Sequence, residues 1–366
     1  QNLQTKISEA IEAFEAKYGW KVESTQIGGY DDVYSTCIAG LTANAQPNIA
    51  YAYSDHVAAY IQSGKVLDLN QFIDSTKEVN GTKLGYTADE KADFVKGYYD
   101  EGLAKNYADY SSYGFTENST LTMPFSKSTE LMYVNVTAMK AAGVETIPTT
   151  WDEFWALGDQ AKQDGISLFT YPTNGYFDNT LNALLKETGG EELLSNVLNY
   201  DKDAWNTDGA KQTIDILTKL VSPDYLYSDT VSNANAKDGF TMNQQAVIDG
   251  KALFMPNGDW VVNEMADTTP EDYHWGLLPL PALEKDGERF VGSMTEQVWI
   301  PAQAKNVDDA KAFLKFIYSE EGVKIMAEGG NIVPTDTMSE TIAAMEDGYT
   351  KEFFSVYDNA SAALGV

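Results

Sequence analysis

The sequence contains very little arginine, cysteine or histidine. Arg289 is the only arginine, Cys37 the only cysteine, and His56 and His274 are the only histidines among 366 residues. One cysteine excludes an intramolecular disulfide, and two histidines leave little imidazole for base catalysis or metal binding. Because bidentate recognition of carboxylate or phosphate usually relies on arginine, the sequence favours an uncharged ligand over an anionic one.

Basic charge is also scarce, with 55 acidic against 25 basic side chains and a formal net charge of −30. Such a surface repels phosphate backbones and anionic lipid headgroups, so we expect no nucleic-acid partner and no direct binding to a membrane surface. No apolar run is long enough to cross a bilayer. The 43% hydrophobic and 22% charged content is typical of a globular protein.

The common catalytic motifs are absent. The sequence has no G-x-S-x-G and no H-E-x-x-H, and Gly64-Lys65 and Gly250-Lys251 lack the flanking residues of a phosphate-binding loop. Asp201–Trp205 begins like a calcium-binding loop but lacks its glycine and its closing glutamate, so we interpret it as the start of a helix. We expect no catalytic residue, no metal and no cofactor. Paired carboxylates of the glycosidase kind stay open as an alternative among so many acids.

Short β-rich segments alternate with helical patterns of ten to fifteen residues. Apolar spacing predicts helices over residues 3–18, 31–41, 150–161 and 207–221, two more between 306 and 330, and strands at 20–24 and 48–53. Thr150 and Glu153 form a capping-box pattern. The alternation predicts α/β architecture with largely parallel sheets. The length predicts two lobes, because one hydrophobic core rarely grows this large.

Several aromatic residues lie in polar stretches instead of on apolar stripes. Tyr51–His56, Tyr171–Phe177 and Asn257–Trp260 place rings beside Asn, Asp and Gly at the ends of predicted strands or helices. A flat ring at such a position covers the apolar face of a ligand while neighbouring polar groups bind its hydroxyls. These three segments are therefore candidate ligand platforms.

Six segments, in order along the chain, carry a family resemblance, and the third of them is Ser167–Gly190. Pro47–Leu69 has a strand, an acidic turn and a Y-x-Q-S-G helix, and Met123–Trp151 contains PFSKST and a P-x-T-W run. Residues 250–260 read GKALFMPNGDW, residues 275–281 read WGLLPLP, and residues 290–334 contain FLKFIYSEEGV and GGNIVPT. Together they resemble the family 1 extracellular solute-binding proteins of bacterial ABC importers. The first segment is most similar to the maltodextrin-binding members, and PFSKST to the glycerol-3-phosphate-binding branch and its oligosaccharide-binding relatives.

The resemblance implies an α/β fold of the two-lobed periplasmic-binding type (type II), with each lobe a β-sheet flanked by helices. It implies an N-lobe of residues 1–125 plus 282–320 and a C-lobe of residues 126–281 plus 321–366. Three hinge crossings are expected near Phe125–Thr129, Leu278–Ala282 and Tyr318–Val323. The ligand would lie in the cleft between the lobes, which would close by a hinge motion.

Carried over by motif position, the resemblance implies nine ligand-binding residues. Asp55 would accept hydrogen bonds from sugar hydroxyls, and Trp260 would stack on a sugar ring. The other seven are Tyr30 on the N-lobe wall, Ser128 on the hinge strand, Asn174, Tyr176 and Phe177 on the C-lobe wall, and Gly292 and Ser293 as backbone and hydroxyl donors. Two alternatives stay open, since Asp55 would also suit a helix N-cap and Trp260 would also suit a core.

The resemblance implies a substrate-binding subunit of an ABC importer, which captures a neutral carbohydrate, an oligosaccharide, and catalyses nothing. Its partners would be that ligand and the membrane permease subunits, and we expect a monomer. We expect a lipoprotein on the extracellular face of a Gram-positive membrane, or else a periplasmic protein, with an N-terminal piece preceding Gln1. The alternatives are a binding protein for glycerol-3-phosphate or a glycerophosphodiester, helped by Lys127, and a carbohydrate-active hydrolase.

Overall fold

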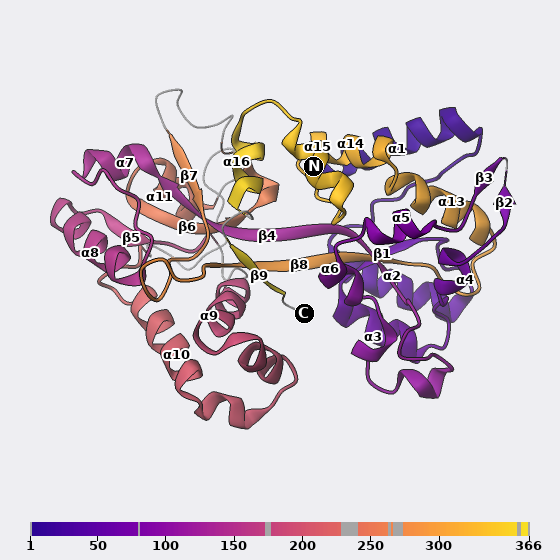
Figure 1. Cartoon of the computed structure of the whole chain (residues 1–366), viewed down its shortest axis with the longest axis horizontal. Helices are drawn as coiled ribbons and strands as arrows, with labels where there is room; N and C mark the ends of the chain where they lie inside the picture. The colour runs from indigo at the N-terminus through magenta and orange to yellow at the C-terminus, as the bar shows by residue number, and fades with distance from the viewer. Residues whose placement is uncertain are drawn as a thin grey trace. The chain divides into compact units, whose positions relative to one another are not determined.

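Two long strands, β4 (Met123–Asn135) and β8 (Phe290–Trp299), carry the chain between two structural units of the computed structural model (Figure 1). The structure describes residues 2–79, 81–172, 177–227, 241–262, 265, 274–356 and 360–364. Unit 1 comprises residues 1–128 and 295–345, and unit 2 comprises residues 129–294 and 346–365. Each unit is therefore built from segments that are distant in the sequence.

Two of the three expected crossings do not lie at a boundary between the units. The first expected crossing, Phe125–Thr129, contains the boundary after Ser128. Leu278–Ala282 lies inside unit 2, and Tyr318–Val323 lies inside unit 1. The first of these segments follows a strand and the second joins two helices. Neither segment therefore carries the chain from one unit into the other.

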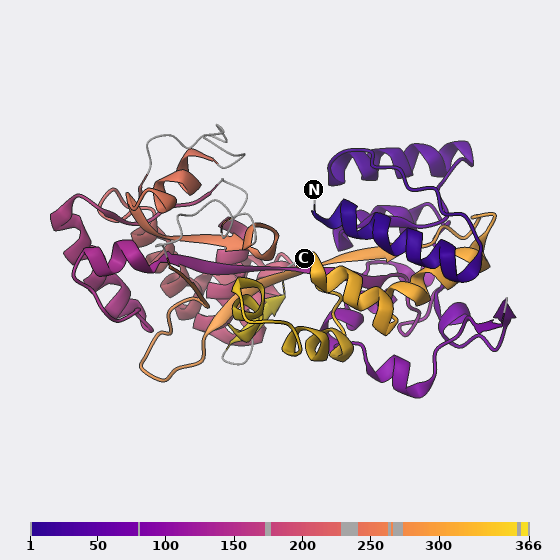
Figure 2. The same cartoon turned by 90° about the horizontal axis from the view of Figure 1, so that it is seen from above.

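Unit 1 is a small sheet surrounded by helices. β1 pairs antiparallel with β8, and Trp299 of β8 stacks on Tyr60 at 4.3 Å. α1 packs against α13 and α14 (Figure 2), where the Phe14 ring contacts Phe313 and Phe316 at 5.3 and 5.7 Å. The elements of unit 1 are α1 (Asn2–Tyr18), α2 (Tyr30–Ala43), β1 (Ala50–Ala52), α3 (Ser54–Gln62), α4 (Asn70–Ile73), β2 (Glu78–Val79), β3 (Thr82–Lys83), α5 (Ala88–Ala92), α6 (Lys96–Asp100), short 3-10 helices at Ala104–Asn106 and Tyr110–Tyr113, the first part of β4, the last part of β8, α13 (Val307–Ile317), α14 (Glu320–Glu328) and α15 (Asp336–Ala343).

Unit 2 has a sheet that is covered by several helices. The second part of β4 pairs antiparallel with β6 and β7, β5 pairs parallel with β6, and β8 pairs parallel with β9. Phe154 of α8 contacts Phe254 of β6 at 4.9 Å in the core. The elements of unit 2 are the second part of β4, α7 (Val136–Ala141), α8 (Trp151–Ala161), a 3-10 helix at Lys162–Asp164, β5 (Ser167–Phe169), α9 (Phe177–Leu198, interrupted at Gly190), η5 (Lys202–Asn206), α10 (Asp208–Leu220), α11 (Met242–Ile248), β6 (Ala252–Gly258), η6 (Asp259–Val261), β7 (Trp275–Leu278), the first part of β8, α16 (Tyr349–Ser355) and β9 (Ser361–Leu364).

The structure confirms the six helices that apolar spacing predicted, as α1, α2, α8, α10, α13 and α14. Their starts follow the expected caps. The Thr150 hydroxyl accepts the Glu153 N–H at 3.3 Å, and the Glu153 carboxylate accepts the Thr150 N–H at 3.3 Å. The Ser319 hydroxyl caps α14 by accepting the Gly322 N–H, without a reciprocal side-chain bond. Asp201 caps η5, which confirms that this segment starts a helix.

Two predictions of secondary structure are wrong. Residues 20–24 form no strand, because the Val22 N–H donates to the Glu15 carboxylate at 2.8 Å instead of to a neighbouring strand. The sheets are not largely parallel, since β4 pairs antiparallel with both β6 and β7, and β1 does so with β8. Alternation of strands and helices along a sequence does not determine which strands become neighbours, and the neighbours set the direction.

Candidate functional site

Tyr30 begins the candidate site in unit 1. It is the first residue of α2 and follows Gly28-Gly29, where the Gly29 N–H donates to the Asp32 carboxylate at 3.1 Å. Gly28 has a φ of +135°, and a Cβ there would lie 2.3 Å from Asp32 Oδ2, so only glycine fits this turn. The local sequence thereby fixes the backbone that presents Tyr30.

Two more tyrosines cover the Tyr30 ring. Tyr51 lies on β1 and Tyr53 directly follows that strand. The rings of Tyr30 and Tyr51 stack with their centroids 5.5 Å apart and an interplanar angle of 19°. The centroid of the Tyr53 ring lies 4.3 Å from that of Tyr30. The Tyr30 and Tyr51 hydroxyl oxygens are 3.2 Å apart. The Tyr30 ring therefore packs against both neighbours while 37% of the residue stays exposed, and its hydroxyl lies beside that of Tyr51.

A buried carboxylate receives these hydroxyls. Glu296 on β8 is 4% exposed, and its Oε1 accepts the Ser128 hydroxyl at 2.6 Å and the Tyr30 hydroxyl at 3.4 Å. Glu296 Oε2 makes no hydrogen bond to any described residue. We call the group Tyr30, Tyr51, Tyr53, Ser128 and Glu296 the tyrosine wall. The structure thus brings the predicted residues Tyr30 and Ser128 together on a glutamate that the sequence analysis did not include.

Burial sets the protonation of the tyrosine wall. It raises the pKa of Glu296 to about 6, and hydrogen bonds from the neighbouring hydroxyls keep that pKa from rising further. Burial, and then the nearby Glu296 carboxylate, raise the pKa values of Tyr30, Tyr51 and Tyr53. At neutral pH the wall therefore combines a carboxylate with tyrosine hydroxyls that keep their protons.

Asp55 lies in unit 1 on the first turn of α3 and is exposed. The N-cap residue of α3 is Tyr53, and the Asp55 carboxylate accepts only the N–H of its neighbour His56, at 2.8 Å, among the hydrogen bonds of the described residues. The interpretation of Asp55 as the N-cap is therefore wrong. An exposed carboxylate two residues after Tyr53 remains suited to accept ligand hydroxyls.

Trp260 lies in unit 2, in η6 directly after β6. Its side chain is 43% exposed, which excludes the core alternative. The ring packs over the Gly258 backbone, where a Cβ would lie 2.0 Å from the indole, so a larger residue at 258 would displace it. The indole is thus held at the end of a strand while much of its surface faces solvent.

The other predicted residues of unit 2 lie in different environments. Phe177, the first residue of α9, is 41% exposed. Ser293 is 1% exposed, and its hydroxyl pairs with the Thr129 hydroxyl at 3.1 Å. Gly292 is buried so close to Asn179 that a Cβ would lie 2.7 Å from the Asn179 carbonyl oxygen. These two β8 residues therefore pack within unit 2. Asn174 and Tyr176 lie outside the described residues.

A second buried carboxylate lies beside Gly292. Glu130 on β4 is 5% exposed and accepts the Asn179 amide at 3.4 Å and the Thr180 hydroxyl at 3.3 Å. Burial raises its pKa well above the ordinary value. The sequence analysis missed both Glu130 and Glu296. A signal for Glu296 was present, because polar residues interrupt an otherwise apolar strand in SMTEQVW.

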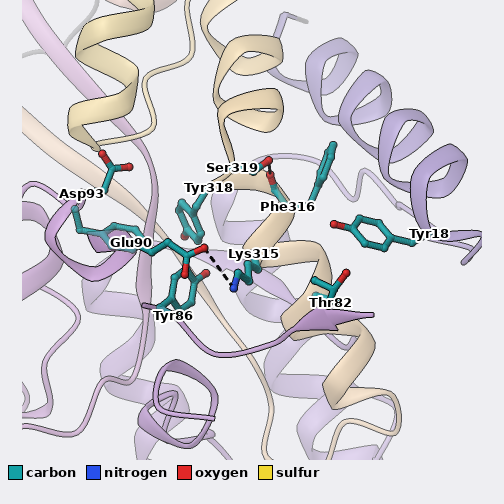
Figure 3. Close-up of a pocket in the computed structure, with 11 residues that line it drawn as sticks. Tyr18, Thr82, Tyr86, Glu90, Asp93, Lys315, Phe316, Tyr318 and Ser319 are labelled. Atoms are coloured by element: carbon teal, nitrogen blue, oxygen red, sulfur yellow. Dashed lines mark hydrogen bonds and ion pairs between the residues drawn. The ribbon is translucent and has the colours of Figure 1, made fainter. Parts of the chain in front are cut away.

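One pocket formed by described residues of unit 1 contains none of the predicted site residues (Figure 3). It has a volume of about 110 Å³ and is lined mainly by aromatic and charged side chains. Lys315 pairs with Glu90 at 3.4 Å and donates to the Gly85 carbonyl at 2.6 Å. Sites for drug-sized ligands have volumes of roughly 300–1,000 Å³, so this pocket is too small for an oligosaccharide.

Comparison with known proteins places the chain in a family. Residues 9–351 match the family described as bacterial extracellular solute-binding protein. The diacetylchitobiose-binding protein of Streptomyces coelicolor is 27% identical over 214 residues, which cover 56% of this chain and 43% of that protein. The chain therefore matches less than half the length of this relative. None of the helices formed by the described residues combines the length and apolarity of a membrane span.

Solved structures confirm the predicted fold. A chitin oligosaccharide-binding protein has a TM-score of 0.71 at 18% identity, covering 99% of this chain and 84% of the other. A glycerophosphocholine complex of UgpB from Mycobacterium tuberculosis also has a TM-score of 0.71, at 15% identity, covering 98% and 84%. Both likenesses concern the fold alone, and they support the two-lobed α/β type. With the family match over residues 9–351, this chain belongs to the bacterial extracellular solute-binding proteins.

Proposed function

We propose that this protein captures an uncharged oligosaccharide as the substrate-binding subunit of a bacterial ABC importer. The tyrosine wall supports an uncharged ligand, because it offers hydroxyls and a carboxylate and contains no basic residue. The only arginine, Arg289, donates to the backbone carbonyls of Leu280 and Pro279 at 2.9 Å each, inside unit 2. The chain thus has no other guanidinium with which to bind a phosphate.

The relatives support a sugar over a glycerophosphodiester. The chain is similar in sequence to a diacetylchitobiose-binding protein. It is similar to the glycerophosphocholine complex in fold alone. A sugar has hydroxyl donors for carboxylates and an apolar face for an indole. Unit 1 supplies carboxylates in Asp55 and Glu296, and unit 2 supplies an exposed indole in Trp260.

We infer that residues of both units bind the same ligand, with Asp55 and the tyrosine wall from unit 1 and Phe177 and Trp260 from unit 2. Ligand binding would then favour a closed arrangement of the units. Small-angle scattering tests this inference. The radius of gyration is expected to fall when an oligosaccharide saturates the protein, and an unchanged radius at saturation would contradict it.

We further propose that binding is not followed by turnover, that the partners are permease subunits of an importer, and that the protein is a monomer. Its place would be the outer face of the membrane, held by a lipid anchor, or the periplasm. Incubating oligosaccharides with a high concentration of the protein tests the absence of turnover. Any released product would favour the alternative of a hydrolase.

A thermal-shift screen tests the proposed ligand class. The probes are diacetylchitobiose, raffinose, maltotriose and glycerol-3-phosphate. A ligand present at 100 times its Kd stabilises the folded protein by about 2.7 kcal/mol, which raises the melting temperature by several degrees. We expect at least one neutral oligosaccharide to do so and glycerol-3-phosphate not to. The reverse result would replace the carbohydrate with a phosphate ligand.

A further inference from the structure

Glu296 is a buried acid of unit 1 whose partners are hydroxyl groups instead of a cation. Ser128 and Tyr30 both donate to the same oxygen, Oε1. The second oxygen, Oε2, is buried and accepts no hydrogen bond from a described residue. A buried polar atom without a partner is costly, and native structures contain few of them. The carboxylate therefore has capacity to accept at least one more hydrogen.

The surrounding residues restrict what can supply that hydrogen. Tyr30 uses its only hydroxyl hydrogen on Glu296, so Tyr51 donates to the Tyr30 oxygen. The Ser128 hydrogen is also used on Oε1, and the buried Ser126 hydroxyl is a further nearby donor that helps to lower the pKa of Glu296. A sugar hydroxyl brings a fresh donor to this cluster. A phosphate or a carboxylate brings no donor and a second negative charge, which a buried carboxylate repels.

We propose that Glu296 is a specificity-determining residue, which selects ligands that offer a hydroxyl hydrogen to its carboxylate and rejects ligands that carry phosphate or carboxylate there. The inference rests on the proposed function and names the residue that enforces the ligand class. It also gives a physical reason for placing a costly charge in the middle of a β-strand.

The neighbouring side chain on β8 provides a matched control. Gln297 follows Glu296 and therefore points to the opposite side of the strand, where its amide donates to Glu101 at 3.4 Å. Burial raises the pKa of Glu101 to about 7. Glu101 is thus a second buried acid beside β8 in unit 1, outside the tyrosine wall. Glu101→Gln makes the same acid-to-amide change without touching the proposed site.

The experiment compares Glu296→Gln and Glu101→Gln with the wild-type protein by calorimetry. The ligand is the neutral oligosaccharide of the screen above that gives the largest thermal shift, and glycerol-3-phosphate is the competitor. Glu296→Gln is expected to lower sugar affinity at least tenfold and to let glycerol-3-phosphate compete at lower concentration. Glu101→Gln is expected to change sugar affinity less than twofold.

The pH profile supplies a readout that a purely structural role would not move, and it uses the wild-type protein should Glu296→Gln fail to fold. The titratable groups that bear on Glu296 are Tyr30 from α2, Tyr51 from β1 and Tyr53, and their raised pKa values keep them neutral near pH 6. Sugar affinity should fall as the pH drops from 7.5 to 5.0. A folded Glu296→Gln protein should lose this dependence.

The outcomes separate the two claims. If sugar binds the wild-type protein, and the Glu296→Gln protein shows the same affinity, pH profile and competition, the role of Glu296 is overturned while the proposed function stands. A flat pH profile in the wild-type protein likewise overturns that role. If glycerol-3-phosphate binds the wild-type protein more tightly than every neutral sugar, or if no sugar binds, both claims fall.

Discussion

The two units use aromatic side chains in different ways. In unit 1, the Tyr30 ring is 37% exposed, packs against Tyr51 and Tyr53, and donates its hydroxyl to a buried carboxylate. In unit 2, Trp260 and Phe177 are 43% and 41% exposed. An aromatic residue can therefore contribute to a binding site through its polar edge or through its apolar face. Unit 1 is expected to decide which ligand binds, and unit 2 to supply much of the affinity.

Replacing the exposed indole should have the largest effect. Trp260→Ala removes an apolar face and is expected to weaken oligosaccharide binding by roughly 2–4 kcal/mol, the scale of a hot-spot aromatic. Calorimetry gives the affinity, and the urea midpoint is expected to stay nearly unchanged because the side chain is exposed. Trp205→Ala is the matched control, since Trp205 is 40% exposed and lies in the same unit.

A loss of stability without a loss of affinity would contradict the proposal that Trp260 of unit 2 binds the ligand. If Trp260→Ala keeps its affinity and loses stability by roughly 3–5 kcal/mol, as a buried tryptophan would, the indole supports the fold instead of the ligand. Equal losses of affinity in the Trp205 and Trp260 variants would mean that the effect is not local.

Removing the exposed carboxylate of unit 1 should have the next largest effect. Asp55→Ala deletes a charge-assisted hydrogen bond to the ligand and is expected to cost roughly 1.5–3 kcal/mol of binding. The melting temperature should barely move, because Asp55 is not the N-cap of α3. Asp89→Ala is the control, since Asp89 is an exposed acid on the first turn of α5 in the same unit. Lost stability with unchanged affinity would assign Asp55 to the helix.

The buried carboxylate should appear in the pH dependence of stability. The pKa of Glu296 is raised from its ordinary value of 4.5 to about 6 in the folded protein. The folded state therefore binds more protons than the unfolded state between these values, and wild-type stability falls by about 2 kcal/mol as the pH rises through them. The Glu296→Gln protein has no carboxyl group at this position, so its stability lacks this dependence on pH. The difference in unfolding free energy, variant minus wild type, should rise by about that amount from pH 4 to pH 7.

Urea unfolding of both proteins at several pH values measures this difference directly. Taking the difference cancels the contributions of the other buried acids, such as Glu101 and Glu187, whose pKa values burial raises to about 7. A difference that stays constant with pH would mean that folding leaves the pKa of Glu296 unshifted.

The smallest effect is expected for a single hydroxyl of the tyrosine wall. Tyr30→Phe keeps the ring stack and removes the hydrogen bond to Glu296, which should lower ligand affinity by roughly 0.5–1.5 kcal/mol. Tyr113→Phe is the control, since Tyr113 lies in the same unit and is 38% exposed. A Tyr30→Phe protein with wild-type affinity would show that the ring, and not the hydroxyl, is what the wall uses.

Local patterns explain how much of the fold could be predicted. The cap at Thr150 depends on a contact over three residues, and it was predicted correctly. Strand direction depends on which distant strands pair, and the predicted parallel sheets are wrong. Short-range hydrogen bonds can be read from a sequence, whereas the choice of partner strands requires the folded chain.

The same distinction applies to the candidate site. Ser128 and Tyr30 meet at Glu296, although 168 and 266 residues separate them from it. Motif position suggested the first two residues, but only the folded chain identifies the carboxylate that joins them. Ser293, expected to donate to a ligand, instead pairs with Thr129 and is 1% exposed. A polar residue on a strand does not reveal from sequence alone whether it faces a ligand or the interior.

A competition titration tests the central claim most directly. The purified protein is titrated by calorimetry with the neutral oligosaccharide that gives the largest thermal shift, with and without a large excess of glycerol-3-phosphate. The account predicts one binding site per chain, with the same affinity in both titrations. If glycerol-3-phosphate abolishes the sugar signal, or if it alone releases heat on binding, the claim that this site selects an uncharged carbohydrate is contradicted.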